Sequence, residues 1–315
     1  MGSHLVEALL AQGYQVRCLV RPTSDVSFIA GLPVDLAYGD LGGATGLEEA
    51  CRDVLAVFHL AGATRALDAQ TLFEVNEQGT ATLLEVCGRA SPDLKRFVYL
   101  SSLAAGGPST GTMPIDETWP ERPVSVYGAS KLAGEERVRA YAGRLPVVIL
   151  RPAPVYGPRD RDILTYFRLV GRGLSLVPGG KPRRVSLIYV SDVVQLALRV
   201  LEDDRSVGQT YFACDGKAHD LDAVLECIAL VLGRRTVRAA VPMRMLEGIA
   251  ALGAASARLL KRPILLNRDK LREMRHPCWL CDSSKAQREL GFAALVDLHS
   301  GIARTAEWYR QEGWL

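Results

Sequence analysis

The stretch SVYGASKLAGE, residues 125–135, holds a tyrosine and a lysine at a spacing that suits proton transfer. Tyr127 and Lys131 are four residues apart, so on a helix they share one face about one turn from each other. A phenol has a pKa of about 10 and is a poor base near neutrality. We expect the ammonium of Lys131 to favour the phenolate and so to lower the pKa of Tyr127. The pair predicts a general acid/base, although the same spacing also fits a half-exposed helical face.

Two serines lie where such a pair would need a partner. The run RFVYLSSLAA, residues 96–105, is typical of a buried strand that ends at Ser101 and Ser102. Open α/β sheets bind ligands at the carboxyl ends of their strands. A serine there can donate a hydrogen bond to a substrate carbonyl oxygen while a tyrosine delivers or removes the proton. A strand-end turn is the alternative interpretation of these serines.

Short strand-like runs alternate with helical runs from Tyr14 to Arg151. These elements would position the tyrosine, the lysine and the two serines. Such alternation predicts a mostly parallel sheet that is covered by helices on both faces. After Arg151 the pattern loosens. We therefore predict a nucleotide-binding domain over residues 1–151 and a mainly substrate-binding region over residues 152–315. Parts of residues 184–214 are expected to return to the first domain.

The composition is that of an ordinary globular protein. Of the 315 residues, 48% are apolar and 23% are charged. The net charge of +3 is small and its basic residues are dispersed, which argues against a nucleic-acid partner. The apolar stretch 245–260 contains Glu247 and Arg258 and is shorter than the roughly 20 residues that span a bilayer. We expect a cytoplasmic protein with no membrane span.

Seven cysteines stand at irregular spacing, mostly inside apolar runs. This distribution favours buried, reduced thiols in a cytosol. Cys278 and Cys281 form a single C-x-x-C with no second pair, so packing is a better interpretation than metal binding. No metal site is predicted.

Seven motifs in a fixed order resemble the extended short-chain dehydrogenase/reductase superfamily, that is, the NAD(P)-dependent epimerase/dehydratase group. They are GDL (39–41), HLAG (59–62), VNEQGT (75–80), YLSS (99–102), YGASK (127–131), RPAPVYGPRD (151–160) and YVSDVV (189–194). The resemblance covers nearly the whole chain. It implies a Rossmann-type, doubly wound parallel sheet with a smaller C-terminal substrate domain.

The resemblance also implies roles for particular residues. Tyr127 matches the general acid/base, Lys131 its electrostatic partner and ribose clamp, and Ser102, rather than Ser101, the donor to the carbonyl oxygen. Other positions match segments that contact the dinucleotide in the family. These are Gly2, Asp40, Leu41, Leu60, Ala61, Gly62, Pro152 and Val155.

The first residues match the family pattern only from its middle. Members begin with a strand and a Gly-x-x-Gly-x-x-Gly turn that leads into the first helix. Gly2 matches the last of these glycines, and residues 3–12 match the helix. The first strand and its glycine turn have no counterpart in this sequence. Because that strand is central in the order 3-2-1-4-5-6, we expect residues 15–20 and 54–60 to flank a place without a strand.

The choice between NADP and NAD is predicted from the end of the second strand of the family pattern. NAD-preferring members usually have an acidic residue there, whereas the segment LVRPTS has Arg21. A guanidinium can pair with the 2′-phosphate of NADP. We therefore expect NADP to be preferred over NAD, with a solvated surface arginine as the alternative.

The resemblance leaves the substrate open. We favour an oxidoreductase that acts on a secondary alcohol or ketone of a small, apolar molecule, as in the dihydroflavonol-reductase and hydroxysteroid-dehydrogenase members. The observations behind this choice are Arg21 and the apolar helix predicted at 241–260. A nucleotide-sugar 4-epimerase or dehydratase is the first alternative, because four arginines could hold a diphosphate: Arg183, Arg184, Arg234 and Arg235. A non-catalytic cofactor-binding sensor or a degenerate relic of an enzyme is the second alternative, and the chain could form a homodimer.

Overall fold

A parallel sheet of four strands forms the centre of the fold. The computed structural model describes residues 1–42, 46–179, 181–260 and 266–315, with only the backbone for residues 254–260. The strand order is β10-β5-β4-β3, and every pair in it is parallel. These strands are β3 (Ala56–His59), β4 (Arg96–Leu100), β5 (Val147–Pro152) and β10 (Thr210–Ala213). The prediction of an α/β fold with a parallel sheet is confirmed.

Two further strands form a separate parallel pair, β1 (Val16–Val20) and β2 (Val34–Tyr38). Within the described part of the chain, β1 pairs only with β2, and β3 pairs only with β4. Residues 16–20 and 56–59 therefore lie at sheet edges in the described part of the chain. Because β1 and β2 are parallel, the loops that follow them start at the same edge of this pair. A hydrogen bond from Gly39 N–H to the Val20 carbonyl joins the two strand ends.

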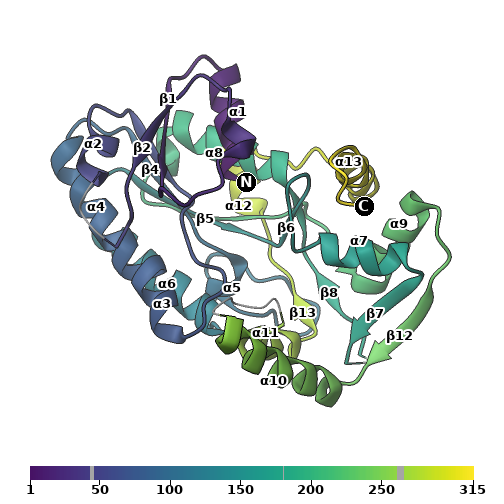
Figure 1. Ribbon diagram of the computed structural model, residues 1–315. Coiled ribbons are helices and arrows are strands. Elements are labelled where there is room, and N and C mark those ends of the chain that lie inside the picture. Colours follow the sequence, from purple (N-terminus) through teal and green to yellow (C-terminus); the bar gives the residue numbers. More distant parts are fainter. Residues whose placement is uncertain (43–45, 180, 261–265) are drawn as a thin grey trace.

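Apolar side chains of the central sheet alternate between two layers of helices. On β4, Phe97 and Tyr99 pack in one apolar cluster with α4, whereas Val98 packs in another with α8 and α12. This alternation follows from the two-residue period of a strand. Figure 1 shows α3, α4 and α6 gathered on one side and α8 and α12 on the other. The helices are α1 (Gly2–Ala11), α2 (Leu47–Cys51), α3 (Ala69–Phe73), α4 (Gly79–Ala90), α5 (Leu103–Gly106), α6 (Val126–Ala140), α8 (Val190–Glu202) and α12 (Ser284–Leu290).

The continuous helical segment from α3 to α4 contains a change of helix type. Between α3 and α4 the residues Glu74–Gln78 form a π-helical turn. Such a turn adds a residue to the helix and is frequent at functional sites. It contains Asn76, which is buried and donates a hydrogen bond to Ser130 in α6.

The C-terminal half adds short sheets and a second group of helices. Phe167, Ile228 and Tyr309 belong to its own apolar cluster. Strand β10 leaves this half and pairs with β5, while the division into domains at residue 151 stays a prediction. The remaining elements are β6 (Val155–Tyr156), β7 (Leu174–Pro178), β8 (Arg184–Val185), β9 (Ile188–Tyr189), β11 (His219–Asp220), β12 (Val237–Val241), β13 (Cys278–Trp279), α7 (Leu164–Gly171), α9 (Leu221–Leu232), α10 (Met243–Leu260), α11 (Arg268–Met274), α13 (Leu298–Gln311), and the 3-10 turns Ser27–Ile29 and Asp204–Ser206.

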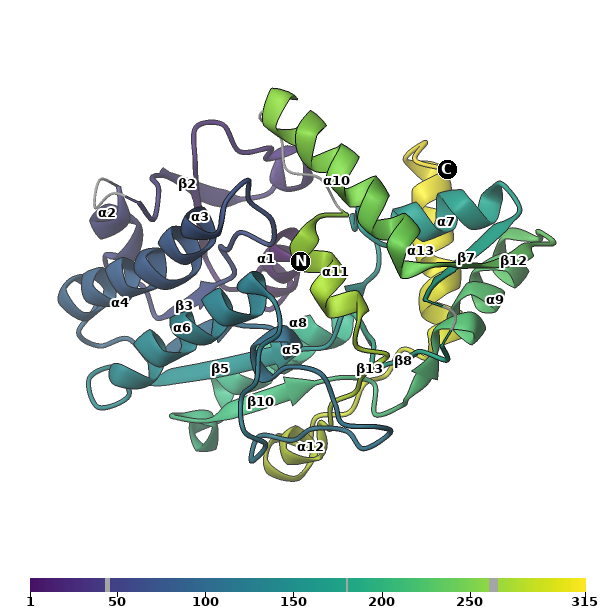
Figure 2. The ribbon, with the colours of Figure 1, turned by 90° about the horizontal axis from the view of Figure 1, so that it is seen from below.

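The helix predicted at 241–260 is present as α10. Figure 2 shows it crossing the molecule beside α11. Its last seven side chains, residues 254–260, lie outside the described residues. None of the helices in the described ranges combines the length and apolar character that crossing a bilayer requires.

Candidate active site

The predicted catalytic residues meet at one edge of the central sheet. Strands β3, β4 and β5 are parallel, so their carboxyl ends lie at the same edge. Ser102 follows β4, and Leu60–Gly62 follow β3. Helix α6 supplies Tyr127 and Lys131, and the Lys131 Nζ donates a hydrogen bond of 2.7 Å to the carbonyl of Leu100 at the end of β4.

Tyr127 lies in the first turn of α6. Ser125 caps this helix by accepting a hydrogen bond of 3.0 Å from Gly128 N–H, which fits the N-cap preference of serine. Burial raises the pKa of Tyr127 to about 12, and the nearby side chain of Ser102 opposes the rise. The geometry thus places a neutral phenol beside a serine hydroxyl, which is the pairing that the sequence predicted.

Lys131 is buried, and its Nζ contacts two neighbours. Besides the Leu100 carbonyl, its Nζ lies 4.2 Å from the centre of the Tyr99 ring, a cation–π arrangement. Burial lowers the pKa of Lys131 to about 7, and the negative charge of Glu135 opposes that change. The expectation that Lys131 lowers the pKa of Tyr127 is not met. Burial dominates both groups, raising the pKa of the phenol and lowering that of the amine.

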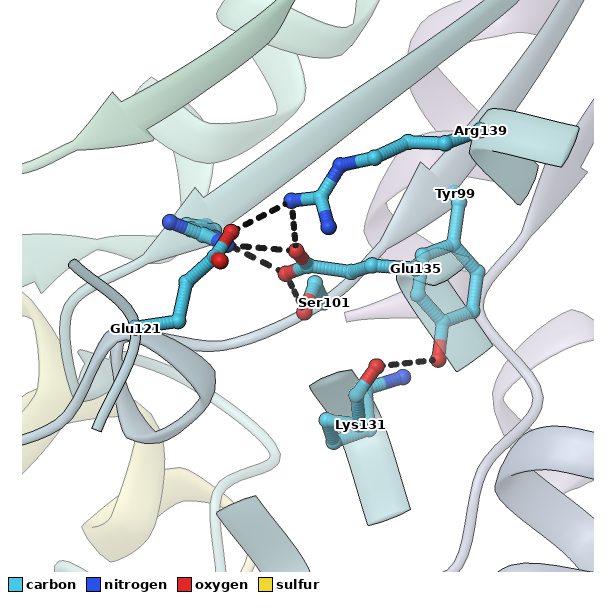
Figure 3. Close-up of polar contacts among 7 residues, drawn as sticks. Tyr99, Ser101, Glu121, Lys131, Glu135 and Arg139 are labelled. Atoms are coloured by element: carbon cyan, nitrogen blue, oxygen red, sulfur yellow. Dashed lines mark hydrogen bonds and ion pairs between the residues drawn. The ribbon is translucent and has the colours of Figure 1, made fainter. Parts of the chain in front are cut away.

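A buried ion network lies behind Lys131 and was not predicted from the sequence. Glu135 and Arg151 are both fully buried and form a bidentate pair, with Nε–Oε1 at 2.8 Å and Nη2–Oε2 at 2.6 Å. Arg139 bonds Glu135 at 2.7 Å, and Ser101 donates a hydrogen bond to the same carboxylate. Figure 3 shows these groups, with Glu121 at the outer end and Lys131 one helical turn away. The four-residue spacing of Lys131 and Glu135 could have revealed this neighbour.

Asn76 joins the loop after β3 to helix α6. Its Oδ1 accepts a hydrogen bond from Ala63 N–H at 2.8 Å, and its Nδ2 donates to the Ala63 carbonyl and to Ser130 Oγ, both at 2.9 Å. Every polar atom of this buried amide therefore has a partner, which rigidifies the loop. Neighbouring His59 is also buried, bonds Thr80 at 2.9 Å, and has its pKa lowered to about 3 by burial, so it is neutral.

Asp269 on α11, in the C-terminal half, accepts hydrogen bonds at the start of α6. Its carboxylate oxygens accept hydrogen bonds from Val126 N–H at 2.6 Å and from Tyr127 N–H at 3.0 Å. A carboxylate is stabilising at a helix N-terminus because of the free N–H groups and the helix dipole. No local pattern announces this contact, since Asp269 and Tyr127 are 142 residues apart.

The loop after β3 fits a bound dinucleotide. At Gly62, a Cβ would lie 3.0 Å from Asn76 Oδ1, which is tighter than most Cβ contacts, and 3.6 Å from Lys131 Nζ, so a side chain here would crowd the Asn76 amide. Leu60 is half-buried, and Ala61 and Gly62 are exposed. At the end of β5, Pro152 is buried and Val155 is half-buried. These residues border the edge that holds Lys131, and they could contact the nicotinamide end of a cofactor.

The other predicted cofactor residues lie farther along the same side. Arg21 is exposed and follows β1, and Asp40 is exposed, follows β2 and accepts a hydrogen bond of 2.9 Å from Gly42 N–H. Leu41 is buried and its Cβ is close to Gly79. Gly2 is the exposed first residue of α1. The two exposed loops could contact the adenosine end, whereas Leu41 packs the loop against α4.

Comparisons with known proteins agree with this geometry. The sequence pattern described as the NAD dependent epimerase/dehydratase family matches residues 1–214. A protein named ceramide reductase from Caulobacter vibrioides is 30% identical over 100% of this chain and 93% of its own length. Sterol demethylase protein B from Methylococcus capsulatus is 31% identical over 100% and 97%. A UDP-glucose 4-epimerase from Vibrio cholerae is 28% identical over 77% and 76%.

Solved structures show the same Rossmann fold. The crystal structure of gox2253 has a TM-score of 0.81 and 26% identity, covering 99% of this chain and 95% of that one. A dTDP-glucose 4,6-dehydratase from Streptomyces venezuelae, solved with NAD and TYD bound, has a TM-score of 0.80 and 24% identity over 99% and 95%. At that identity the second likeness concerns the fold alone.

Proposed function

The chain is an enzyme of the NAD dependent epimerase/dehydratase family, and from this premise we propose that it transfers a hydride between NADP(H) and a secondary alcohol or ketone of a small, apolar substrate. The observation that carries the proposal is that Ser102 lies near Tyr127 while Lys131, four residues along the same helix, is buried and held by the Leu100 carbonyl at the end of β4. A bound nicotinamide would supply or accept the hydride, so the protein must move one proton.

Tyr127 is suited to moving that proton. Its pKa of about 12 keeps the phenol protonated at neutral pH, so it can donate to the oxygen of a ketone as that oxygen becomes negative. Ser102 can donate a second hydrogen bond to the same oxygen. Lys131 holds positive charge within the same site below pH 7 and would stabilise the phenolate that remains after the proton has left.

The arginines that could hold a nucleotide sugar are already engaged or remote. The Arg183 guanidinium donates hydrogen bonds to the carbonyls of Pro178 at 2.7 Å, His276 at 3.3 Å and Met274. Arg184 pairs with Asp220 at 3.1 Å. A diphosphate would have to displace these partners, which supports a substrate without phosphate groups. Arg234 and Arg235 are exposed beyond the end of α9.

Names of the relatives favour the same substrate class. The two relatives that match the full chain at 30% and 31% identity are named for ceramide and sterol, both of which are apolar molecules with a hydroxyl group.

Arg21, exposed after β1, supports NADP as the preferred cofactor because its guanidinium is free to meet a 2′-phosphate.

A panel of substrates tests the proposal. The purified chain is mixed with NADPH or NADH and with a steroid ketone, a long-chain aliphatic ketone, UDP-glucose or dTDP-glucose, and the loss of reduced nicotinamide and the sugar products are followed. We expect turnover with an apolar ketone and none with the sugars, and Tyr127→Phe should abolish it. Formation of a 4-epimer or a 4-keto-6-deoxy sugar would contradict the proposal. Binding of cofactor without any turnover would point to a sensor instead.

A further inference from the structure

The outward face of α10 is apolar. Met245, Ile249 and Leu252 are 59%, 47% and 78% exposed, and their spacing of four and three residues places them on one face of the helix. The opposite face packs on the molecule, where Ala250 is fully buried and Leu246 is half-buried. A helix that is apolar on both faces normally has a partner on each. The outward face, defined here as Met245, Ile249 and Leu252, has none in the described part of the chain.

The segment of sequence that contains this face is basic. Residues 243–276 contain eight arginines and lysines against three acidic residues, so this segment has a net charge of +5 while the rest of the chain has −2. Glu247 and Glu273 are paired with Arg275 and Lys270. Arg244 and Arg268 are exposed and take part in none of the ion pairs of the described residues. The chemistry of the patch therefore calls for an apolar partner with negative charge.

Helix α10, which carries the outward face, is connected to the helix of Tyr127 through α11. The ion pair of Arg275 and Glu247, 2.9 Å long, fastens α10 to α11. Asp269 in α11 in turn accepts the backbone N–H groups of Val126 and Tyr127. Figure 2 shows α10 and α11 side by side. Helix α11 alone thus separates α10, which carries the outward face, from the start of α6.

We propose that the outward face of α10 docks the enzyme peripherally on the surface of a lipid bilayer that contains anionic lipids. An apolar helix face combined with clustered basic residues is the combination that binds such interfaces. A second copy of the chain is a poorer occupant, because it would bring two segments of net charge +5 together. The docking stands on the helix alone. Uptake of an apolar substrate directly from the bilayer rests in addition on the proposed function.

Vesicle binding tests the docking without substrate or cofactor. The full chain is sedimented with vesicles of phosphatidylcholine and with vesicles in which part of it is replaced by phosphatidylglycerol. We expect binding to the second kind only. The double variant Ile249→Glu and Leu252→Glu should weaken it at least about tenfold, because two apolar side chains no longer enter the lipid. Arg244→Gln and Arg268→Gln should each weaken it about fivefold.

Leu230 on α9, 72% exposed, provides the matched control. Leu230→Glu should leave vesicle binding unchanged, and equal losses in the control and in the α10 variants would overturn the proposal. So would the absence of binding to either vesicle. A shift from dimer to monomer on gel filtration in the α10 double variant, with no vesicle binding by the wild type, would assign the face to a second copy. Turnover of a water-soluble ketone should be unchanged in every variant, which separates failure of docking from failure of the proposed function.

Discussion

Lys131 and Arg21 are both expected to contact the same dinucleotide, yet their surroundings are opposite. Lys131 is buried and fixed by the Leu100 carbonyl and the Tyr99 ring. Arg21 is exposed, and among the described residues its guanidinium takes part in none of the hydrogen bonds or ion pairs.

The difference separates chemistry from cofactor choice. Ordering of Lys131 occurs on folding, so its geometry is set before any ligand arrives. Arg21 would lose its side-chain freedom only when it binds a phosphate, and that loss subtracts from the affinity it provides. Changes in the buried region should therefore alter rate and stability strongly, whereas changes at Arg21 should alter only which cofactor binds.

The largest effect is expected for Tyr127→Phe. Removing the phenol oxygen removes the proton donor, so kcat should fall by about 10² to 10⁴. Cofactor affinity and thermal stability should change little, because the ring remains. Steady-state rates and cofactor titration measure both quantities. Tyr141→Phe, at the other end of α6, is the control and should retain the wild-type rate. Near-normal activity of Tyr127→Phe would mean that another group moves the proton.

Glu135→Gln should be the most destabilising change. It leaves Arg151 buried and partly unpaired, and breaking a buried ion pair from one side costs about 3–5 kcal/mol of unfolding free energy. Urea denaturation followed by fluorescence measures the loss. Glu136→Gln, at the exposed neighbouring position, should stay close to the wild type. If both variants unfolded at the same urea concentration, the network would contribute nothing to stability.

The same variant has a predicted pH signature. The charge of Glu135 favours the ammonium of Lys131, whose pKa is about 7, so its removal should lower that pKa further. A rate that needs the ammonium falls as pH rises through this pKa, and the midpoint of that fall should move to lower pH in Glu135→Gln. A pH–rate profile of kcat measures it.

Unfolded lysine has a pKa of about 10.4, so between pH 7 and about 10 the unfolded state binds more protons and Lys131 makes stability rise with pH. Lys131→Met should remove this rise.

Arg21→Ala should affect cofactor choice alone. Loss of a charge-assisted hydrogen bond to the 2′-phosphate should weaken NADP(H) binding by about 1.5–3 kcal/mol and leave NAD(H) binding unchanged. Titration of both cofactors against the wild type and the variant measures the gap. Arg52→Ala, another exposed arginine, should change neither affinity. Equal affinities of the wild-type protein for NADP(H) and NAD(H) would refute the role of Arg21.

Asp269→Asn should have the smallest effect and sharpen the boundary between the two regions. The amide keeps one acceptor oxygen but loses the charge that favours the N-terminus of α6, worth about 1 kcal/mol. We expect kcat to fall about fivefold with cofactor affinity unchanged. Asp35→Asn, exposed on β2, is the matched control. An unchanged rate would show that Tyr127 is positioned without help from α11.

Sequence reasoning succeeds here where the cause is local. Strand ends, the spacing of Tyr127 and Lys131, and the edge position of Ser102 all follow from short patterns. It fails where distant segments meet, as for the contact of Asp269 with the start of α6. It also fails where two local effects compete. Proximity of charge predicts a lowered pKa for Tyr127, but the depth at which the phenol lies outweighs it, and depth is a property of the folded chain.

The π-helical turn at Glu74–Gln78 has a consequence for the phase of the helix around it. One residue corresponds to a rotation of about 100°. Leu72 before the turn and Leu84 after it are both buried, and Asn76 within it faces Ser130. Deleting one residue here would restore a regular helix but rotate α4 against α3, so that either the leucines or the asparagine would leave their places. The π-helical turn thus maintains the relative rotation of α3 and α4. Single-residue deletions in this segment should therefore be tolerated far less than substitutions at its exposed positions.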